Sequence, residues 1–250
     1  MYDILLITPT HRNIEAPTVH SREKLTMMCP QWGLKTFWMI FPGDALIGRA
    51  RSIACTQFLE NDYAPYMLFI DSDIIFEPED VKRIYDDLRN GYDLVVGNYV
   101  VRSGAQLAHY AWGSEEGQVK IRHDGSIIDM EYVSTGFMGI SKKLLRDMVE
   151  KLELPLLHEN DFSRCYPFFE CGRYLDRSEP IYISEDWDFC EKARKTGYKC
   201  YLDTGIQLGH LGAYAWKLQD VVRIQTEAAK AAKPIKQHGG TKKNRKKKRR

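Results

Sequence analysis

The strongest constraint on the fold is the alternation of short apolar runs with helix-like segments over the first 100 residues. Strands are predicted at 2–7, 35–41, 66–70 and 93–96, each ending at a turn or a polar cluster. Helices are predicted between them, at 19–28, at 46–60, and from the acidic segment 77–80 to the Asn90-Gly91 pair. Repeated units of this kind favour an α/β fold with a Rossmann-like, mostly parallel central sheet flanked by helices.

After residue 100 the pattern changes. Short strands expected at 107–112, 118–122 and 127–132 predict a small antiparallel subsheet. A strand at 135–140, helices at 142–152, 185–196 and 213–232, and terminal strands at 199–202 and 206–210 complete the predicted domain. The segment 155–178 is irregular and rich in aromatic and charged residues, which is typical of a substrate loop.

Charge is distributed unevenly along the 250 residues, a length that suits one domain with a short appendage. Residues 233–250 hold ten Lys or Arg and no acid, whereas residues 1–232 hold 26 basic and 34 acidic residues, a net charge of −8. We therefore predict a domain over 1–232 and a disordered basic tail over 233–250. Such a tail binds polyanions, so DNA, RNA and an anionic membrane surface are open as partners, beside a purely solubilising role.

Cysteine usage and apolar patterning indicate a cellular location. The six cysteines form no CxxC pair, the first residues lack the basic and apolar regions of a signal peptide, and no apolar run approaches the roughly 18–20 residues of a membrane span. We expect reduced thiols in a cytoplasmic protein, with peripheral attachment to membrane or nucleic acid through the tail.

The first chemical motif is Asp71-Ser72-Asp73, directly after the predicted strand 66–70. Alternate residues of an extended segment point to the same side, so Asp71 and Asp73 can face one point. Two carboxylates at the carboxyl end of a buried strand suit Mg²⁺ or Mn²⁺, because ligand sites of open α/β sheets lie at that edge. An ordinary polar turn would also explain these residues.

The second motif is the acidic start of the helix predicted at 185–196. Helical spacing puts Asp186 on the same face as Phe189 and Cys190, at the N-terminal end of the face that packs inward, where it can look into a cleft. A carboxylate there can act as a general base for an acceptor hydroxyl, and Trp187 beside it can stack on a sugar or a base. Helix capping alone would also account for acids at this position.

A late histidine stands between two glycines, in Gly209-His210-Leu211-Gly212. The glycines permit close backbone approach. A neutral imidazole can complete a metal site whose other protein ligand is a carboxylate, and this combination suits Mn²⁺ better than Mg²⁺. A structural histidine is the alternative.

Candidate donor contacts lie in the first loop and the second helix. Arg12, Arg49 and Arg51 suit phosphate oxygens, although Arg49 and Arg51 lie about 200° apart on a helix, so that only one of them faces a given phosphate. Thr8 and Thr10, after the first strand, can bond a nucleotide base or ribose. Each residue is also compatible with an ordinary polar loop.

In their order and spacing, these motifs resemble those of a GT-A-fold, nucleotide-sugar-dependent glycosyltransferase of the inverting, family-2-like type. The resemblance covers residues 3 to 215. The matching segments are Leu6-Ile7-Thr8-Pro9-Thr10, Gly48-Arg49-Ala50-Arg51, Phe69-Ile70-Asp71-Ser72-Asp73, Ser134-Thr135-Gly136-Phe137-Met138-Gly139-Ile140, Glu185-Asp186-Trp187-Asp188-Phe189-Cys190 and Gly209-His210-Leu211-Gly212.

The resemblance implies a metal-dependent donor site. Asp73, with Asp71 nearby, would bind Mn²⁺ or Mg²⁺ bridging the donor diphosphate, and Asp71 would also contact the ribose. His210 matches the late histidine that completes the metal site in some members, and Ser72 lies among the donor contacts. A uridine-diphosphate sugar is the favoured donor.

The resemblance also implies the transfer step. Asp186 matches the acid that deprotonates the acceptor hydroxyl, and Gly136 lies where the family lets the donor sugar approach the backbone. Attack from the face opposite the diphosphate would invert the anomeric configuration. The acceptor is a hydroxyl of unknown type, on a glycan, a lipid-linked glycan or a nucleic acid.

Other functions stay open at this point. They are a retaining GT-A transferase, an enzyme that glycosylates a nucleic-acid base, and a non-catalytic glycan- or nucleic-acid-binding module on the same scaffold. A nucleotidyltransferase is disfavoured, because the loop from Thr8 to Arg12 contains no glycine. The Walker, HExxH and GxSxG motifs do not occur.

Overall fold

A computed structural model describes residues 1–102, 106–109, 124–174, 180–212 and 215–231. The helices and strands, in chain order, are β1 (Ile4–Thr10), α1 (Ala16–Trp32), β2 (Thr36–Pro42), α2 (Ile47–Glu60), β3 (Tyr66–Ile70), β4 (Ile74–Ile75), α3 (Pro78–Arg89), β5 (Leu94–Asn98), β6 (Ile127–Met130), β7 (Phe137–Ser141), α4 (Lys142–Lys151), β8 (Gly172–Tyr174), β9 (Ile181–Ile183), α5 (Glu185–Lys195), β10 (Cys200–Gln207), β11 (Gly209–Leu211), β12 (Ala215–Trp216) and α6 (Leu218–Ala231).

A seven-stranded sheet in the order β2-β1-β3-β7-β5-β10-β6 forms the centre of the molecule. Strand β1 is parallel to β2 and β3, and β10 is parallel to β5. Strand β7 runs antiparallel between β3 and β5, and β6 runs antiparallel to β10 at the edge. Five strands therefore point the same way and end at one edge, which confirms the predicted α/β fold with a mostly parallel sheet.

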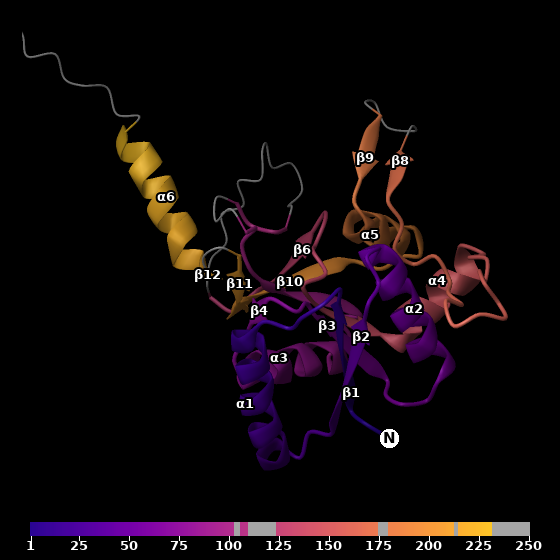
Figure 1. The fold of residues 1–250 in the computed structure, drawn as a ribbon. Coiled ribbons are helices and arrows are strands. Elements are labelled where there is room, and N and C mark those ends of the chain that lie inside the picture. The colour runs from indigo at the N-terminus through magenta and orange to yellow at the C-terminus, as the bar shows by residue number, and fades with distance from the viewer. Residues whose placement is uncertain (103–105, 110–123, 175–179, 213–214, 232–250) are drawn as a thin grey trace, which may run out of the picture.

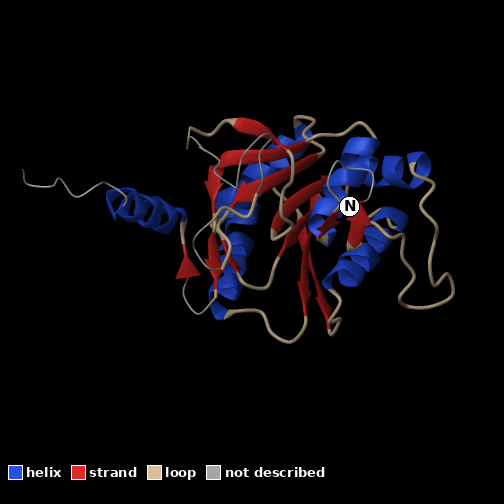
Figure 2. Ribbon diagram, turned by 90° about the horizontal axis from the view of Figure 1, so that it is seen from above, coloured by secondary structure: helices blue, strands red, loops and turns tan. Residues whose placement is uncertain are grey.

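Helices cover both faces of this sheet (Figure 1), and the layers are clearest from above (Figure 2). Side chains alternate along β1: Leu5 and Ile7 join the core under α2, α4 and α5, whereas Ile4 and Leu6 join the core under α1 and α3. The four side chains are at most 1% exposed. A strand buried on both faces reads as a continuous apolar run, which is why the first strand was predictable.

The small antiparallel sheet differs from the prediction. It consists of β12, β11 and β4 rather than of segments between 107 and 132. Among the described residues of those segments, only β6 is a regular strand, and it extends the central sheet. Leu107 makes an isolated bridge to Val100, and residues 110–123, with the strand predicted at 118–122, lie outside the described residues.

The C-terminal part also departs from the predicted boundaries. Two strands were predicted here, at 199–202 and 206–210, but a single strand, β10, runs from the first into the second. The β-bulge between Asp203 and Gln207 explains why the sequence pattern looks like two separate strands. Helix α6 starts at Leu218, not at 213, because β12 precedes it and the Asp220 carboxylate accepts a hydrogen bond from the Lys217 amide at 3.0 Å. The predicted disorder of 233–250 falls outside the described residues.

Two smaller features bear on function. The β8–β9 hairpin rises beside α5, and α6 projects away from the sheet (Figure 1). Within the described part of the chain, none of the helices combines the length and apolar composition needed to cross a membrane. All six cysteines are free thiols, as expected.

Candidate active site

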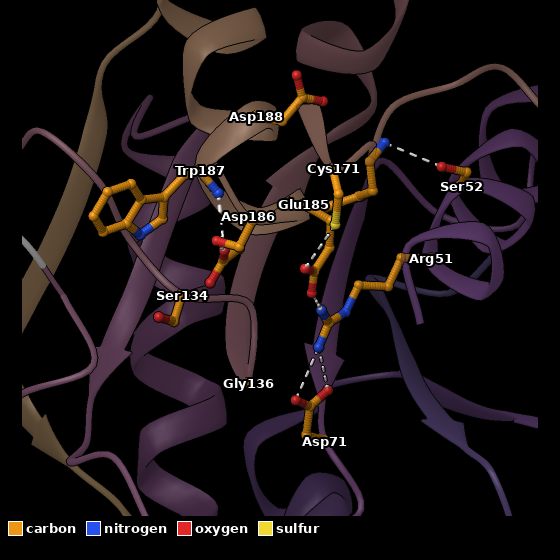
Figure 3. Close-up of polar contacts among 12 residues, drawn as sticks. Arg51, Ser52, Asp71, Ser134, Gly136, Cys171, Glu185, Asp186, Trp187 and Asp188 are labelled. Atoms are coloured by element: carbon orange, nitrogen blue, oxygen red, sulfur yellow. Dashed lines mark hydrogen bonds and ion pairs between the residues drawn. The ribbon is translucent and has the colours of Figure 1, made fainter. Parts of the chain in front are cut away.

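The chemistry-bearing residues meet at the edge where the parallel strands end. The Asp71–Asp73 turn follows β3, residues 99–102 follow β5, and Asp186 begins α5, which packs behind the same edge. Figure 3 shows Arg51, Asp71, Gly136 and Asp186 converging there from four different parts of the chain. The location is the one expected for the ligand site of an open α/β sheet.

Arg51 ties Asp71 to the start of α5. Its guanidinium donates to both carboxylate oxygens of Asp71, each at 2.9 Å, and to Glu185 Oε1 at 2.7 Å (Figure 3). The side chain is only 4% exposed. Burial alone would lower the pKa of Arg51, but the Asp71 and Glu185 charges outweigh it and raise the pKa. The predicted phosphate contact of Arg51 is therefore corrected, because its Nη1 and Nη2 donors serve two carboxylates.

Asp73 lies in a different cluster. Its Oδ2 contacts Arg102 Nη2 and lies 3.5 Å from His210 Nε2. Burial would raise the pKa of Asp73, but His210 and Arg102 hold it below its ordinary value. Burial would lower the pKa of His210, but the hydrogen bonds to Asp73 and to the Val100 carbonyl raise it. The two motif acids are thus held by separate partners.

The β4–β11 pairing brings Asp73 and His210 together. His210 lies opposite Ile74 in the antiparallel register, and the Leu211 amide donates to the Asp73 carbonyl at 2.9 Å. His210 Nδ1 lies 2.7 Å from the carbonyl oxygen of Val100, two residues after the end of strand β5. Three segments distant in sequence therefore fix one imidazole.

Asp73 and His210 form a donor set that fits a divalent cation. With Nδ1–H donated to a backbone carbonyl, Nε2 is left as the ligand atom, which is the usual arrangement of metal-binding histidines. One carboxylate and one imidazole suit Mn²⁺. Asp71 does not join them: its oxygens face Arg51, and within the described residues no three His, Cys, Asp or Glu side chains gather to hold a metal ion. Further ligands would come from substrate and water.

Asp186 lies half-exposed at the first turn of α5, while Phe189 and Cys190 on the same helix are fully buried. Its Oδ1 accepts hydrogen bonds from the Ser184 hydroxyl and from the Trp187 amide, the latter at 2.9 Å. Figure 3 shows its carboxylate on the side of Ser134 and Gly136. The predicted position of Asp186 at the open end of a buried helix face is confirmed.

Trp187 has a partner that the sequence did not indicate. Its ring stacks on Tyr132 with centroids 4.2 Å apart and planes within 5°, and the Arg194 guanidinium lies 4.9 Å from the Tyr132 centroid. In this structure Trp187 therefore stacks within the protein, where the prediction assigned it to a sugar or a base. The stack fixes the first turn of α5, from which Asp186 projects.

Tyr99 fills the space in front of Gly136. The Gly136 amide donates to the Tyr99 hydroxyl at 2.9 Å, and a Cβ on Gly136 would lie 2.6 Å from that oxygen. The Tyr99 ring makes edge contacts with His109 and His210, and burial raises its pKa far above the ordinary value. Gly136 thus admits the phenol, whereas the prediction reserved this space for the donor sugar.

The other predicted donor contacts divide into buried and exposed residues. Thr8 is fully buried and its hydroxyl accepts from Trp38 Nε1 at 2.9 Å, so its predicted donor contact is corrected to a packing role. The Thr10 hydroxyl donates to the Asn13 carbonyl at 2.7 Å. Arg12 is exposed. Arg49 is half-exposed and pairs with Asp44 at 2.8 Å. The Ser72 carbonyl accepts a hydrogen bond from the Glu15 amide at 2.8 Å.

Three participants were missed: Tyr99, Arg102 and Glu185. Tyr99 and Arg102 follow β5 in the same way that Asp71 and Asp73 follow β3, so strand-end position was the available signal. Glu185 stood in a recognised motif, but its link to Arg51 depends on residues 134 positions apart. Sequence spacing holds no information about that contact.

Part of the chain is similar to a known protein family. Residues 47–149 match the family model described as glycosyl transferase family 2. No curated protein matches the chain. A197 from STIV has a similar crystal structure, with a TM-score of 0.54 at 16% identity over 84% of this chain and 86% of that one, a likeness of fold.

Two further structures are similar at lower scores. One is a glycosyltransferase involved in the glycosylation of the major capsid of PBCV-1, at a TM-score of 0.33 and 16% identity over 60% of this chain. The other is S. aureus TarS 1-349, at 0.43 and 13% identity over 81% of this chain. The present chain spans 64% and 58% of their respective lengths.

Proposed function

We propose that this chain, which has the GT-A fold and matches the glycosyl transferase family 2 model over residues 47–149, transfers a sugar from a nucleotide diphosphate to an acceptor hydroxyl with the aid of a divalent cation and with inversion. The observation that supports this most is the proximity of Asp73 and His210 at the sheet edge that also presents Asp186. A uridine-diphosphate sugar is the proposed donor.

Asp73 and His210 would hold the cation, Mn²⁺ in preference to Mg²⁺. When bound, the cation stabilises the negative charge that develops on the departing diphosphate. Asp71, held at both oxygens by Arg51, is the proposed contact for the ribose. Thr10, Arg12, Arg49 and Ser72 remain proposed donor contacts around it.

Asp186 is the proposed general base. Both hydrogen bonds that the structure gives its carboxylate end on Oδ1, so Oδ2 is the oxygen that would take the acceptor proton. The acceptor oxygen bonds to the anomeric carbon, the bond from that carbon to the diphosphate oxygen breaks, and the hydroxyl proton passes to Asp186. Attack from the side opposite the diphosphate inverts the configuration.

The donor half of the proposal is tested by thermal unfolding with uridine-, guanosine- and thymidine-diphosphate sugars, each with Mn²⁺ or with EDTA. A donor at 100 times its Kd should stabilise the protein by about 2.7 kcal/mol, which is a shift of a few degrees in Tm. We expect the shift with Mn²⁺ only, and none in Asp73→Asn. Equal shifts in EDTA would refute the metal role.

The base is tested by Asp186→Asn. This variant should keep donor binding and lose roughly 10²- to 10⁴-fold in transfer rate. Asp188→Asn is the control for a loss of rate that comes from weakened folding alone, because Asp188 faces away from Asp186 (Figure 3) and forms a buried ion pair with Lys192 at 2.6 Å. Near-normal turnover by Asp186→Asn, or a product with retained configuration, would contradict the proposed step.

The acceptor stays a proposal of class: a hydroxyl on a glycan, a lipid-linked glycan or a nucleic acid. The basic segment 242–250 is proposed to hold the enzyme on a polyanion, either nucleic acid or an anionic membrane surface. Its deletion should weaken salt-sensitive retention on heparin and on anionic vesicles. Unchanged retention on both would exclude this role.

A further inference from the structure

Arg102 lies against the carboxylate that the proposed cation would use. Its Nη2 contacts Asp73 Oδ2, the oxygen that His210 Nε2 also approaches at 3.5 Å. Its aliphatic stem runs beside Gly212, where a Cβ would lie 3.5 Å from Arg102 Cβ. The guanidinium therefore contacts the same Asp73 oxygen that His210 approaches, an oxygen that a cation bound to Asp73 and His210 would need.

The contact is exchangeable, unlike that of Arg51. The Arg102 side chain is 67% exposed and its hydrogen bonding to the described residues goes to one oxygen. Arg51 is 4% exposed and has three charged hydrogen bonds to two acids. Exposed ion pairs are weak because water screens them, so Arg102 can leave Asp73 at little cost.

A divalent cation on Asp73 would displace the guanidinium by competition and by charge repulsion. The cation would bring an anionic diphosphate within reach of the displaced side chain. A guanidinium binds phosphate oxygens through two parallel N–H groups, an arrangement that a single carboxylate oxygen does not use. Once the cation and the diphosphate are bound, the diphosphate would therefore bind Arg102 more strongly than Asp73 does in the empty site.

We propose that Arg102 exchanges partners during donor binding: it neutralises Asp73 in the empty site and pairs with the donor diphosphate once the cation occupies Asp73 and His210. The inference rests on the proposed metal-dependent function. It adds a diphosphate-binding residue that is also a competitor of the metal, and it predicts effects of opposite sign for the two ligands.

The metal arm uses the full chain and Mn²⁺ alone, with free Mn²⁺ measured by electron paramagnetic resonance. Arg102→Ala should bind Mn²⁺ about two- to fivefold more tightly than the native protein, since an exposed ion pair no longer competes. Arg89→Ala is the control, because Arg89 is an exposed arginine at the end of α3, at the opposite edge of the sheet. It removes the same charge and should leave Mn²⁺ affinity unchanged.

The diphosphate arm titrates uridine diphosphate, and separately inorganic pyrophosphate, into Mn²⁺-saturated protein by calorimetry. Arg102→Ala should bind both at least about tenfold more weakly, the loss expected for a charge-assisted contact. The affinity of Arg102→Lys for each ligand should lie between those of the native protein and Arg102→Ala, since lysine keeps the charge but lacks the two parallel N–H groups. The exposed position of Arg102 predicts an unchanged Tm for both variants.

Tighter Mn²⁺ binding together with weaker diphosphate binding establishes the exchange. A change of the same sign in both arms, or an Arg102→Ala value equal to that of Arg89→Ala in either arm, overturns it. Failure of the proposed function gives a different result: native protein that binds Mn²⁺ but no uridine diphosphate refutes the donor site. In that case Arg102 has no diphosphate to pair with, and the proposed exchange of partners is overturned as well.

Discussion

Two clusters that begin at neighbouring residues of one turn have opposite physical characters. Asp71 is held by a buried arginine that also binds Glu185, whereas Asp73 is held by an exposed arginine and a histidine. In the first cluster both carboxylates bind the buried Arg51 guanidinium, so these residues stabilise the fold. The second cluster leaves an oxygen and an imidazole nitrogen that a ligand can take over. The comparison teaches that an acidic pair in sequence need not be a metal-binding pair in space.

The comparison is tested most severely by Arg51→Met. This change leaves Asp71 and Glu185 without their partner at a largely buried site, so we expect a loss of about 2–4 kcal/mol of folding free energy, discounted for the partial exposure of both acids. Urea unfolding measures the free energy of unfolding of Arg51→Met and of Arg102→Ala, and we expect a large loss in the first variant only. The distinction between the clusters fails if the two variants lose the same stability.

Gly136→Ala probes the residue between the clusters. The new Cβ would lie 2.6 Å from the Tyr99 hydroxyl, and Tyr99 contacts His210 through its ring edge. Overpacking of this kind costs about 1–3 kcal/mol and should shift Tyr99 toward His210, weakening Mn²⁺ binding.

Gly212→Ala is the matched control for Gly136→Ala. A Cβ there meets its nearest neighbour at 3.5 Å, an ordinary contact. Its stability should match that of the native protein. A native-like Gly136→Ala, measured by the same thermal unfolding and Mn²⁺ titration, would show that Tyr99 yields freely and does not separate the clusters.

A third arginine cluster, formed by Arg83, Asp203 and Asp87, lies away from the site and predicts a pH dependence of stability. Burial, together with the hydrogen bond and charge of Asp203, raises the pKa of Asp87 to about 7. The ordinary pKa of Asp is about 3.9, so the folded state binds the extra proton between these values and stability falls as pH rises from about 4 through 7. Asp87→Asn imitates the protonated acid and should flatten this fall in Tm between pH 5 and 8.

The neighbouring Asp86→Asn provides the control for that pH profile. Asp86 pairs with Lys82 at 2.5 Å on the exposed side of α3, where ion pairs contribute little. Its Tm profile should run parallel to that of the native protein. If Asp87→Asn gives that same profile, Asp87 does not carry the proton.

Local patterns in the sequence predicted most of the architecture, because the elements of this fold have local causes. Buried strands read as apolar runs, and α3 carried its proline, its acids and its Asn90-Gly91 end. The position of Asp186 followed from helical spacing. These inferences need only a window of about one helix or strand.

The parts of the site that were not predicted depend on contacts between distant segments. Whether Arg51 faces a phosphate or two acids depends on where α2 and α5 pack, 134 residues apart in sequence. The stacking of Trp187 on Tyr132 and the burial of Thr8 under Trp38 have the same origin. The small sheet was misplaced because strands of two and three residues leave almost no periodic signal.

The short ladder between β4 and β11 has a consequence for how the enzyme matures. The ladder that brings His210 beside Asp73 has two paired residues on each strand, and a slip of one position would turn the imidazole to the other side of the ribbon. A partly synthesised chain that ends before β11 has the turn acids but not the histidine. The histidine of the proposed metal site therefore joins the turn acids only after β11 has been synthesised and has paired with β4.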